Sequence, residues 1–479
     1  MISFLIRMQP RLLLTFLTML TGCAQFHERP LNPVDSVMRL EARTLDSAGL
    51  RHFIHTVGRP INAWSLAAWD LDKLTLAAMY YHPDLAIARA QAEITDAATI
   101  TAAQHPNPNI TLSPTWISNL ATTAVPWIAA SSLSIPIETA GKRGFRINKS
   151  DHLTEAAHLR IADTVWLVRG RLRLAMLDVY AAQETVRLLQ QQVGIEQTIN
   201  QHLQQQQAAG EIAYPDVLSA QLALNQAQLN LTAAQKKRVE SKSLLAAAIG
   251  VPVDALVGIE LDFVDLARLP DLDNIPVARL KEIALRERSD VQAALADYAA
   301  SQSALQLEIA NQYPNIQANP GYTWEMGEHR WVLGATALQL PILHQNQGLI
   351  AEAEAKRQES AVRFEGLQLR ILGEIDRACA GILAVRARWD ASEQLEYNRQ
   401  DNLRSARALL QAGELDAHGV AVAELEQSVA ERARMDVLIE SQQILALLEA
   451  ALRYPMTSAF AIRLLSTSAL KTYSQKTRQ

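Results

Sequence analysis

Hydrophobic residues in the first half of the chain recur every seven positions, from Val165 to Val193, and again three positions after each of the first four of these. This a/d spacing is typical of long helices that pack as a left-handed coiled coil. Proline, which interrupts helices, is nearly absent from the same region. We therefore predict a helix over about 138–208, which at ~1.5 Å per residue would be about 100 Å long.

Two other stretches change to a period of two: SLSIPIETAGKRG, beginning at Ser132, and ALQLPILHQNQG, beginning at Ala337. Alternation of apolar with smaller or polar residues is the pattern of a half-exposed β-strand. Each stretch follows another alternating run, so we predict β-hairpins at about 109–137 and 315–342. The apolar positions of the four strands are Ile110, Leu112, Trp116, Leu133, Ile135, Ile137, Ile316, Tyr322, Trp324, Leu338, Leu340 and Ile342.

The two hairpins occupy matching places in an internal repeat with an offset of about 200 residues. Pro108-Asn109-Ile110 aligns with Pro314-Asn315-Ile316, and AGEI beginning at Ala209 aligns with AGEL beginning at Ala412. Each half would contain a helix, a hairpin, a long helix, a turn and a helix. The predicted segments are a signal peptide (1–22), an extended N-terminal segment (23–71), repeat 1 (72–250), a connector (251–279), repeat 2 (280–454) and a C-terminal tail (455–479).

The N-terminus has the layout of a bacterial lipoprotein signal. Arg7 and Arg11 flank an apolar run that is too short to span a bilayer, and Leu-Thr-Gly-Cys follows it. This tetrapeptide resembles a lipobox, which predicts that Cys23 is acylated. An ordinary secretory signal, or an interfacial helix with a chance cysteine, is the alternative. Cys379, among apolar neighbours, is interpreted as a buried small side chain.

Composition argues against several other functions. The chain has 479 residues with a net charge of −5 and no long basic run, which does not suit a nucleic-acid surface. We find no phosphate-binding loop and no nucleophile elbow. The nearest histidine pair, His52 and His55, is more typical of solvent-facing side chains than of a metal site. We expect no catalytic centre, no cofactor and no bound metal.

Tryptophans cluster beside the predicted hairpins, as in the aromatic belts of membrane barrels. These are Trp116, Trp127, Trp324 and Trp331. The strands have the length that a tilted strand needs to cross a bilayer. Four strands cannot close a barrel, and open edges in lipid leave backbone groups unpaired, so several chains would have to share one barrel. The alternative is that the hairpins form a small soluble cap on a helical rod.

The hairpin pieces LSIPIETAGKR and LQLPILHQNQGLIAEAEAKR, with the turns QAAGEIAYPDVLSAQ and QAGELDAHGVAVAEL, resemble the TolC-type outer-membrane efflux protein family over nearly the whole mature chain. The GKR and NQG pieces are similar to those of the branch that works with metal-cation pumps of the resistance-nodulation-division (RND) type. The resemblance implies a mainly α fold with a small β part. In it, long antiparallel coiled-coil helices form an α-barrel, and two hairpins per chain contribute to a 12-stranded β-barrel of a homotrimer in outer-membrane lipid. It also implies a periplasmic membrane-fusion adaptor and an inner-membrane RND pump as partners.

The similar turns of the family form the periplasmic tip. The resemblance therefore implies adaptor contacts at Ala209, Gly210, Glu211, Ile212, Ala412, Gly413, Glu414 and Leu415. It makes Asp216 and Glu211 candidates for an acidic ring in the closed aperture. The chain departs from the family pattern at Gly419, which aligns with Asp216 where a second aspartate is expected. From the glycines alone, plain helix-hairpin turns are an equal alternative.

Two classes of function follow. The first is a lipid-anchored outer-membrane exit duct that extends into the periplasm and passively conducts heavy-metal cations, with multidrug efflux or type I protein secretion as alternative cargoes. The second is a periplasmic coiled-coil scaffold or adaptor without a pore.

Overall fold

The computed structural model describes residues 26–56, 68–118, 126–270, 276–325, 327–336 and 342–456. The chain divides into two compact units, Met1–Arg43 and Thr44–Gln479, which are described separately. Cys23, the signal peptide and most of the predicted C-terminal tail lie outside the described residues. So do Leu338 and Leu340. No helix among the described residues is long and apolar enough to cross a membrane.

Two short helices occupy the N-terminal segment that the sequence analysis treats as extended. In the first unit, α3 spans Pro33–Glu41. The Asn32 side chain caps it by accepting a hydrogen bond from the backbone N–H of Val34, and Pro33 suits the first turn because its missing N–H is not needed there. In the second unit, α4 spans Ala48–Thr56 and buries Leu50, Phe53 and Ile54.

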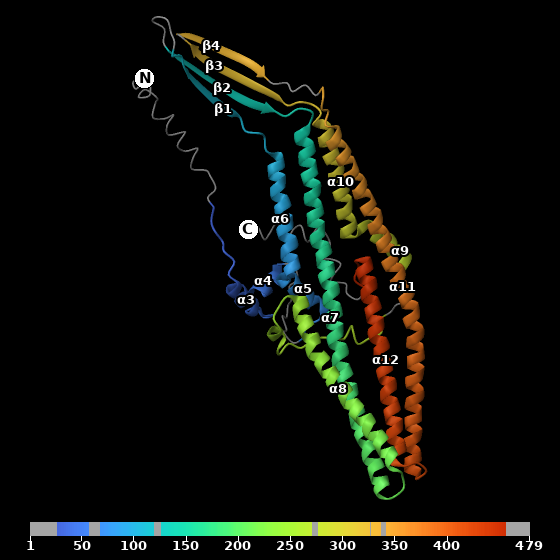
Figure 1. The fold of residues 1–479 in the computed structure, drawn as a ribbon. Helices are drawn as coiled ribbons and strands as arrows, with labels where there is room; N and C mark the ends of the chain where they lie inside the picture. The colour runs from blue at the N-terminus through green and yellow to red at the C-terminus, as the bar shows by residue number, and fades with distance from the viewer. Residues whose placement is uncertain are drawn as a thin grey trace. The chain divides into compact units, whose positions relative to one another are not determined.

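The rest of the second unit contains the same order of elements twice, which the predicted internal repeat requires (Figure 1). The repeat itself stays a prediction. The first series is α5 (Leu71–Tyr81), α6 (Pro83–Ala103), β1 (Asn109–Trp116), β2 (Trp127–Ile137), α7 (Lys142–Ala208) and α8 (Tyr214–Ile249). A 3-10 turn, η2 (Val253–Leu256), follows. The second series is α9 (Val277–Glu287), α10 (Ser289–Ala310), β3 (Ile316–Glu325), β4 (Glu328–Thr336), α11 (Gln347–Ala412) and α12 (Ala417–Leu452).

The single helix predicted at the start of each half is wrong, because each is broken into two. Pro83 excludes helical backbone at the preceding residue, and His82 is accordingly extended, with φ −69° and ψ 127°. The second break, at Arg288, needs no proline. Its guanidinium, which is buried, binds the carboxylate of Asp290 and the backbone carbonyl of Ala451, and these contacts hold the residue outside both helices.

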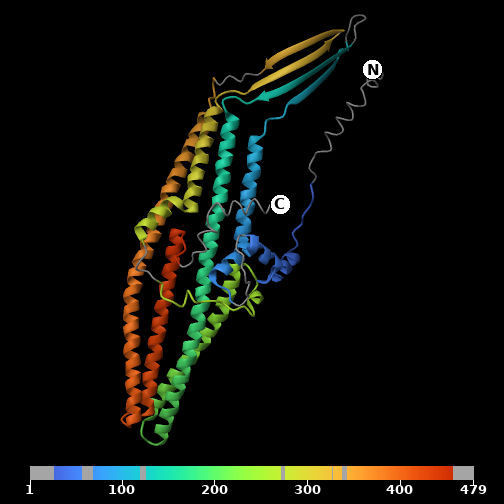
Figure 2. The ribbon, with the colours of Figure 1, turned by 180° about the vertical axis from the view of Figure 1, so that it is seen from behind.

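The heptad pattern is confirmed as a buried seam along α7. Both sets of positions are at most 9% exposed: Val165, Leu172, Val179, Val186 and Val193, and Val168, Ala175, Ala182 and Leu189. Successive apolar clusters pack this seam first on α5 and α8 and then on α8 alone. Figure 2 shows α12 lying between α7 and α11, and both helix pairs turn at the end away from the strands. Packing of small residues thus keeps 67 residues of α7 in one uninterrupted helix.

The four strands form one antiparallel sheet in the order β1-β2-β3-β4. The register of β3 and β4 ends at the pair Glu325↔Glu328, next to Gly327, whose φ of +92° suits a tight hairpin turn. β4 spans Glu328–Thr336, and Ile342 lies in a bend, so the prediction that the strand reaches Ile342 is wrong.

Candidate functional site

One face of the sheet is strongly apolar and the other is polar. Side chains alternate between the two faces along each strand, and the register places most of the large apolar side chains of the four strands on one face, with Ile128 and Val332 on the other. That face carries Ile110, Leu112, Trp116, Trp127, Leu133, Ile135, Ile137, Ile316, Tyr322, Trp324, Trp331 and Leu333. The opposite face carries Thr111, Ser113, Ser132, Ser134, Gln317, Asn319, Thr323, Glu325, Glu328 and Arg330. A sheet with these two faces suits lipid on one side and water on the other.

The apolar face of the sheet is exposed to solvent in the single chain. Ile110, Leu112 and Leu333 are 73%, 71% and 96% exposed, and they lie on β1 and β4, the two edge strands. In a monomer in water this face would be an aggregation hazard. The sheet therefore needs lipid, further strands or both.

The tryptophans expected to form an aromatic belt occupy this apolar face, three of them at the hairpin ends. Trp116 and Trp127 are opposite each other in the last pair of the first hairpin, with ring centroids 4.8 Å apart. Trp324 lies one pair from the end of the second hairpin, and Trp331 packs on Tyr322 at 4.8 Å. Their assignment to a membrane interface remains a prediction.

Two arginines of the first turns of α7, Arg143 of the GKR segment and Arg146, anchor the start of this helix to the end of α6. Arg143 donates two hydrogen bonds to the carbonyl of Ala103, at 2.9 and 2.7 Å. Arg146 donates to the carbonyls of Ala102 and Gln104, at 2.9 and 3.2 Å. The last carbonyls of a helix lack intrahelical partners and carry partial negative charge, which explains why arginines suit these positions.

The lysine of the GKR segment contacts the second half of the chain. Lys142 is 7% exposed and donates from Nζ to the carbonyl of Tyr313 at 2.6 Å and to Asn315 Oδ1 at 2.7 Å. In the NQG segment, Asn346 donates to the carbonyl of Glu308 at 2.8 Å. Both segments thus join the strands to helix ends, which gives a physical reason for their composition.

The turn between α7 and α8 leaves the helix through Gly210, whose φ is +78°. The backbone N–H of Glu211 then donates to the carbonyl of Gln206 at 2.9 Å, which closes the last turn of α7. Ala209, Gly210 and Glu211 are exposed, and Ile212 is half-buried.

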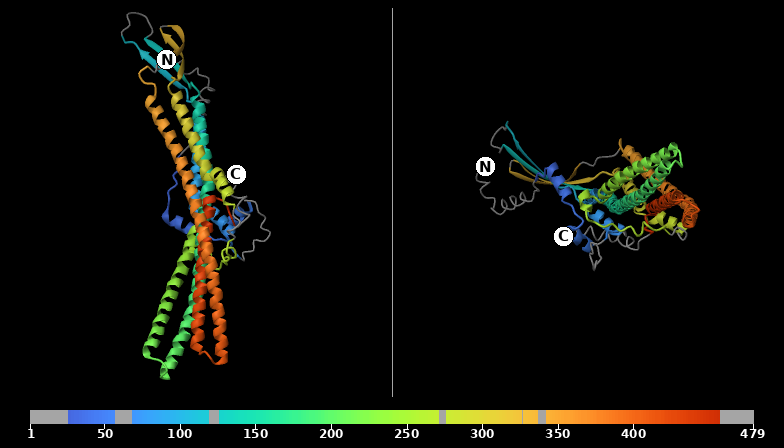
Figure 3. Two further views of the ribbon diagram at one scale, coloured as in Figure 1. Left: turned by 90° about the vertical axis from the view of Figure 1, so that its right-hand side faces the viewer. Right: turned by 90° about the horizontal axis from the view of Figure 1, so that it is seen from below.

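The turn between α11 and α12 has the same construction. Gly413 has a φ of +75°, and the N–H of Glu414 donates to the carbonyl of Leu409 at 2.9 Å. Ala412, Gly413 and Glu414 are exposed, whereas Leu415 is half-buried against the start of α12. The two turns lie at the same end of the helices, opposite the sheet (Figure 3).

Asp416 links the two turns, and the sequence analysis missed it. Its Oδ1 accepts a hydrogen bond from the N–H of Gly419 at 2.8 Å, and its Oδ2 accepts one from Gln206 Nε2 at 3.0 Å. The bond from Gly419, followed by that from Gln206, lowers the pKa of Asp416. An Asp three positions before a helical N–H is a capping signal that could have identified it.

The two carboxylates proposed for the aperture are exposed. Glu211 lies in the turn between α7 and α8, and Asp216 lies in the first helical turn of α8. Neither side chain has a hydrogen bond or ion pair within the described part of the chain. The same part contains no group of three His, Cys, Asp or Glu side chains that could hold a metal ion. Any acidic ring would require copies of these residues from other chains.

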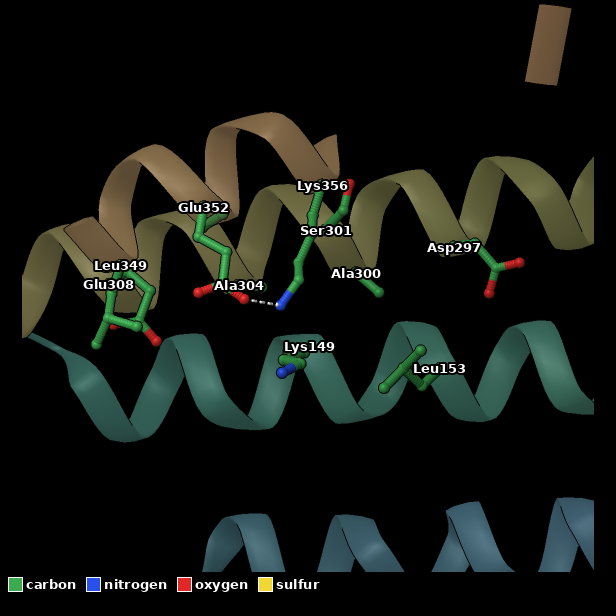
Figure 4. Close-up of a pocket in the computed structure, with 11 residues that line it drawn as sticks. Lys149, Leu153, Asp297, Ala300, Ser301, Ala304, Glu308, Leu349, Glu352 and Lys356 are labelled. Carbon is green, nitrogen blue, oxygen red and sulfur yellow. Dashed lines mark hydrogen bonds and ion pairs between the residues drawn. The ribbon is translucent and has the colours of Figure 1, made fainter. Parts of the chain in front are cut away.

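A recess of about 330 Å³ lies between α7, α10 and α11 near their sheet ends (Figure 4). Leu153, Leu349 and small residues of α10 form much of its wall, and Lys356 pairs with Glu352 at 2.5 Å. Lys149 also lines it and has no ion pair among the described residues. Charges of both signs line this recess, so its chemistry does not select one ligand class.

Residues 77–251, which include the first hairpin, α7 and α8, match the family model described as outer membrane efflux protein. This part of the chain is similar to the outer membrane efflux protein family. Among curated relatives, the cobalt-zinc-cadmium resistance protein CzcC of Cupriavidus metallidurans is 27% identical over 245 residues, 51% of this chain. The match spans about half of that relative, 56% of its length.

Solved structures of outer-membrane channels share this fold. The channel OprN has a TM-score of 0.67 at 17% identity, over 91% of this chain and all of that one. The outer membrane protein VceC of Vibrio cholerae has a TM-score of 0.65 at 20% identity, over 81% and 96% of the chains. CusC has a TM-score of 0.65 at 17% identity, over 90% and 99%. The mainly α fold with two hairpins per chain is thus confirmed.

Proposed function

We propose that this protein is the outer-membrane exit duct of a tripartite efflux system. The observation that carries the proposal is the sheet with one exposed apolar face and one polar face, joined directly to helices of 67 and 66 residues. Strands of this kind suit a bilayer, and the helices suit a passage through the periplasm. The similarity to the outer membrane efflux protein family supports a passive channel rather than an enzyme.

The functional unit would be a homotrimer. One chain supplies four strands whose outer members, β1 and β4, have no further strand beside them among the described residues. Backbone groups on a free edge cannot stay unpaired in lipid, so strands of neighbouring copies would complete the ladder. Three copies give the 12 strands implied by the family resemblance.

Heavy-metal cations are the proposed cargo. The support is the name of the cobalt-zinc-cadmium resistance relative and the GKR and NQG segments. Multidrug efflux and type I secretion remain the alternative cargoes, since a pump selects cargo before it enters the duct. An RND pump and a membrane-fusion adaptor are the proposed partners, with the adaptor at the two exposed turns.

The test separates the duct from its cargo. Purified protein would be reconstituted in a planar bilayer, where trimers and stepwise conductance are expected; soluble monomers without conductance would favour a periplasmic scaffold. A deletion strain would then be challenged with Co²⁺, Zn²⁺, Cd²⁺ and a panel of drugs, with and without the gene. Conductance combined with drug sensitivity alone would keep the duct and reject the metal cargo.

A further inference from the structure

The heptad seam of α7 continues past its last apolar d position into polar residues. Seven residues after Leu189 the next d position is Glu196, and seven residues after Val193 the next a position is Asn200. Both polar side chains are buried, at 6% and 7% exposed. A carboxyl group and an amide therefore lie in the core of the helix packing, towards the end of α7 that leads into the first turn.

Apolar contacts flank Glu196 on both sides along the helix. Val193, three residues before it, belongs to a buried cluster with α8, and Ile199, three residues after it, belongs to a buried cluster with α8 and α12. Residues three apart are neighbours on a helix surface, so Glu196 lies between these two clusters. Their other buried members are Leu224 and Ala227 in the first and Ala220 and Ala421 in the second.

Glu196 has no hydrogen bond or ion pair within the part of the chain that the structure describes. Its own helix pair offers no cation, because neither lysine nor arginine occurs between Arg187 and Lys236. The facing stretch of α8, from 217 to 235, contains no charged residue of either sign. His202 follows six residues after Glu196, which places it on another side of α7.

The charged residues of α12 at this level have other partners. Glu424 and Glu426 pair with Arg407 and Arg399 of α11, at 2.9 and 2.5 Å. Glu431 accepts a hydrogen bond from a glutamine of its own helix at 3.3 Å. All three are acidic, so this stretch of α12 gives Glu196 no counter-charge.

The next position of the seam adds an acceptor rather than a donor. Asn200 donates from Nδ2 to Gln221 Oε1 at 3.2 Å, whereas its buried Oδ1 has no hydrogen-bond partner among the described residues. Asn200 follows Glu196 by one helical turn, so the two side chains are neighbours. A proton on the Glu196 carboxyl would remove its charge and provide a donor beside this oxygen. Burial raises the pKa of Glu196, in agreement with this state.

We propose that Glu196 is a pH-sensitive joint in the packing of α7 on α8 and α12. With the carboxyl protonated, the three helices pack tightly; with it ionised, an unpaired charge lies in an apolar seam, which loosens them. Because the pKa is raised, tight packing is fully present below the ordinary pKa of glutamate and weakens as pH rises through the raised value. Gly210 follows about 20 Å further along the chain, so the loosening would reach the first turn. The joint acts within one chain, whichever cargo the duct conducts.

The test measures hydrogen exchange by mass spectrometry on the full-length protein in detergent. Wild type and Glu196→Gln are compared at the same pH, so that intrinsic exchange rates cancel. At about pH 8, peptides covering 193–203 and 217–228 should exchange more slowly in Glu196→Gln, by about tenfold for each unit by which the pKa is raised. At about pH 4, near the ordinary pKa of glutamate, this difference should largely disappear. Glu393→Gln is the matched control, because this exposed carboxylate on α11 has no ion pair among the described residues, and it should change nothing at either pH.

Glu196→Leu, which makes the seam apolar at this position, should slow exchange at about pH 8 at least as much as Glu196→Gln does. Three results would overturn the proposal. Faster exchange in Glu196→Gln would mean that the ionised carboxylate has a favourable partner. Equal exchange in wild type and Glu196→Gln at both pH values would mean that the charge does not act on the packing. Slowing by Glu196→Gln that is the same at both pH values would assign the effect to side-chain packing instead of charge.

Discussion

The two faces of the sheet predict opposite responses to arginine at neighbouring positions of β2. Leu133 lies on the apolar face opposite Ile110, and Ser132 lies on the polar face between Thr111 and Gly321. Strand β2 has 11 residues, so at about 3.3 Å per residue and a tilt of about 40° it spans a height of about 28 Å. This height is close to the hydrocarbon thickness of about 30 Å, and both residues lie near its middle.

Leu133→Arg should therefore destabilise the membrane-inserted protein by about 2–4 kcal/mol, the usual cost of arginine on a lipid-facing midplane position. That cost corresponds to a change of about 30-fold to 900-fold in the unfolding equilibrium. Ser132→Arg should cost much less, because its side chain would enter water and Gly321 opposite leaves room. It should instead alter conductance through its added positive charge.

The assay is urea unfolding in lipid vesicles, followed by the loss of heat-resistant trimer on gels, with Leu133→Gln and Ser132→Gln as uncharged controls. Single-channel recordings of the same variants would report the lumen. Equal destabilisation by both arginines, or none by either, would mean that β2 does not have lipid on one side and water on the other.

Four further predictions concern the anchor and the helix turns. Cys23→Ser should abolish fatty-acid labelling, and retained labelling would reject acylation at this residue. Gly210→Trp and Gly413→Trp should abolish adaptor crosslinking and metal resistance while trimers still form. Alanine at each glycine is the control for the strain of about 1–2 kcal/mol that a side chain meets at positive φ. Normal efflux by both tryptophan variants would place the docking surface elsewhere. Asp216→Asn should change cation selectivity only modestly, so a complete loss of selectivity in bilayer recordings would contradict the proposed shared ring. Asp416→Ala should cost about 0.5–2 kcal/mol of folding stability as a lost N-cap, whereas Asp416→Asn should not. Because the pKa of Asp416 is lowered, the stability advantage of the wild type over Asp416→Ala should be present at neutral pH and disappear as pH falls through that lowered value. An advantage that persists in strong acid would argue against the cap.

The long helices were predictable because local sequence and packing agree. The seam from Val165 to Val193 gave a helix over 138–208, and α7 spans Lys142–Ala208. The break at His82 was also available from the sequence, since Pro83 follows it. The break at Arg288 was not, because it depends on a carbonyl of α12 more than 150 residues away.

The strands show where periodicity alone is insufficient. Alternation continues through LQLPI, but it does not say which residues pair. The turn at Gly327 sets the register of β3 and β4. A Met-Gly pair between two polar residues was a weak turn signal. The register that this turn gives to the nine residues of β4 depends on the pairing with β3, which the sequence alone does not show.

Charged residues on a heptad helix are normally interpreted as its solvated side, and this rule failed at Arg169 and Arg173. Their partners, Glu449 and Gln442, lie about 270 residues away and face them only after α12 has packed on α7. The GKR segment shows the same arrangement, because the hydrogen-bond acceptors of Lys142 follow α10 in the chain. In both places a cation from the first half of the chain binds oxygen atoms from the second half. The apolar seams set the length and pairing of the helices, and these polar contacts fix the two halves against each other at defined positions.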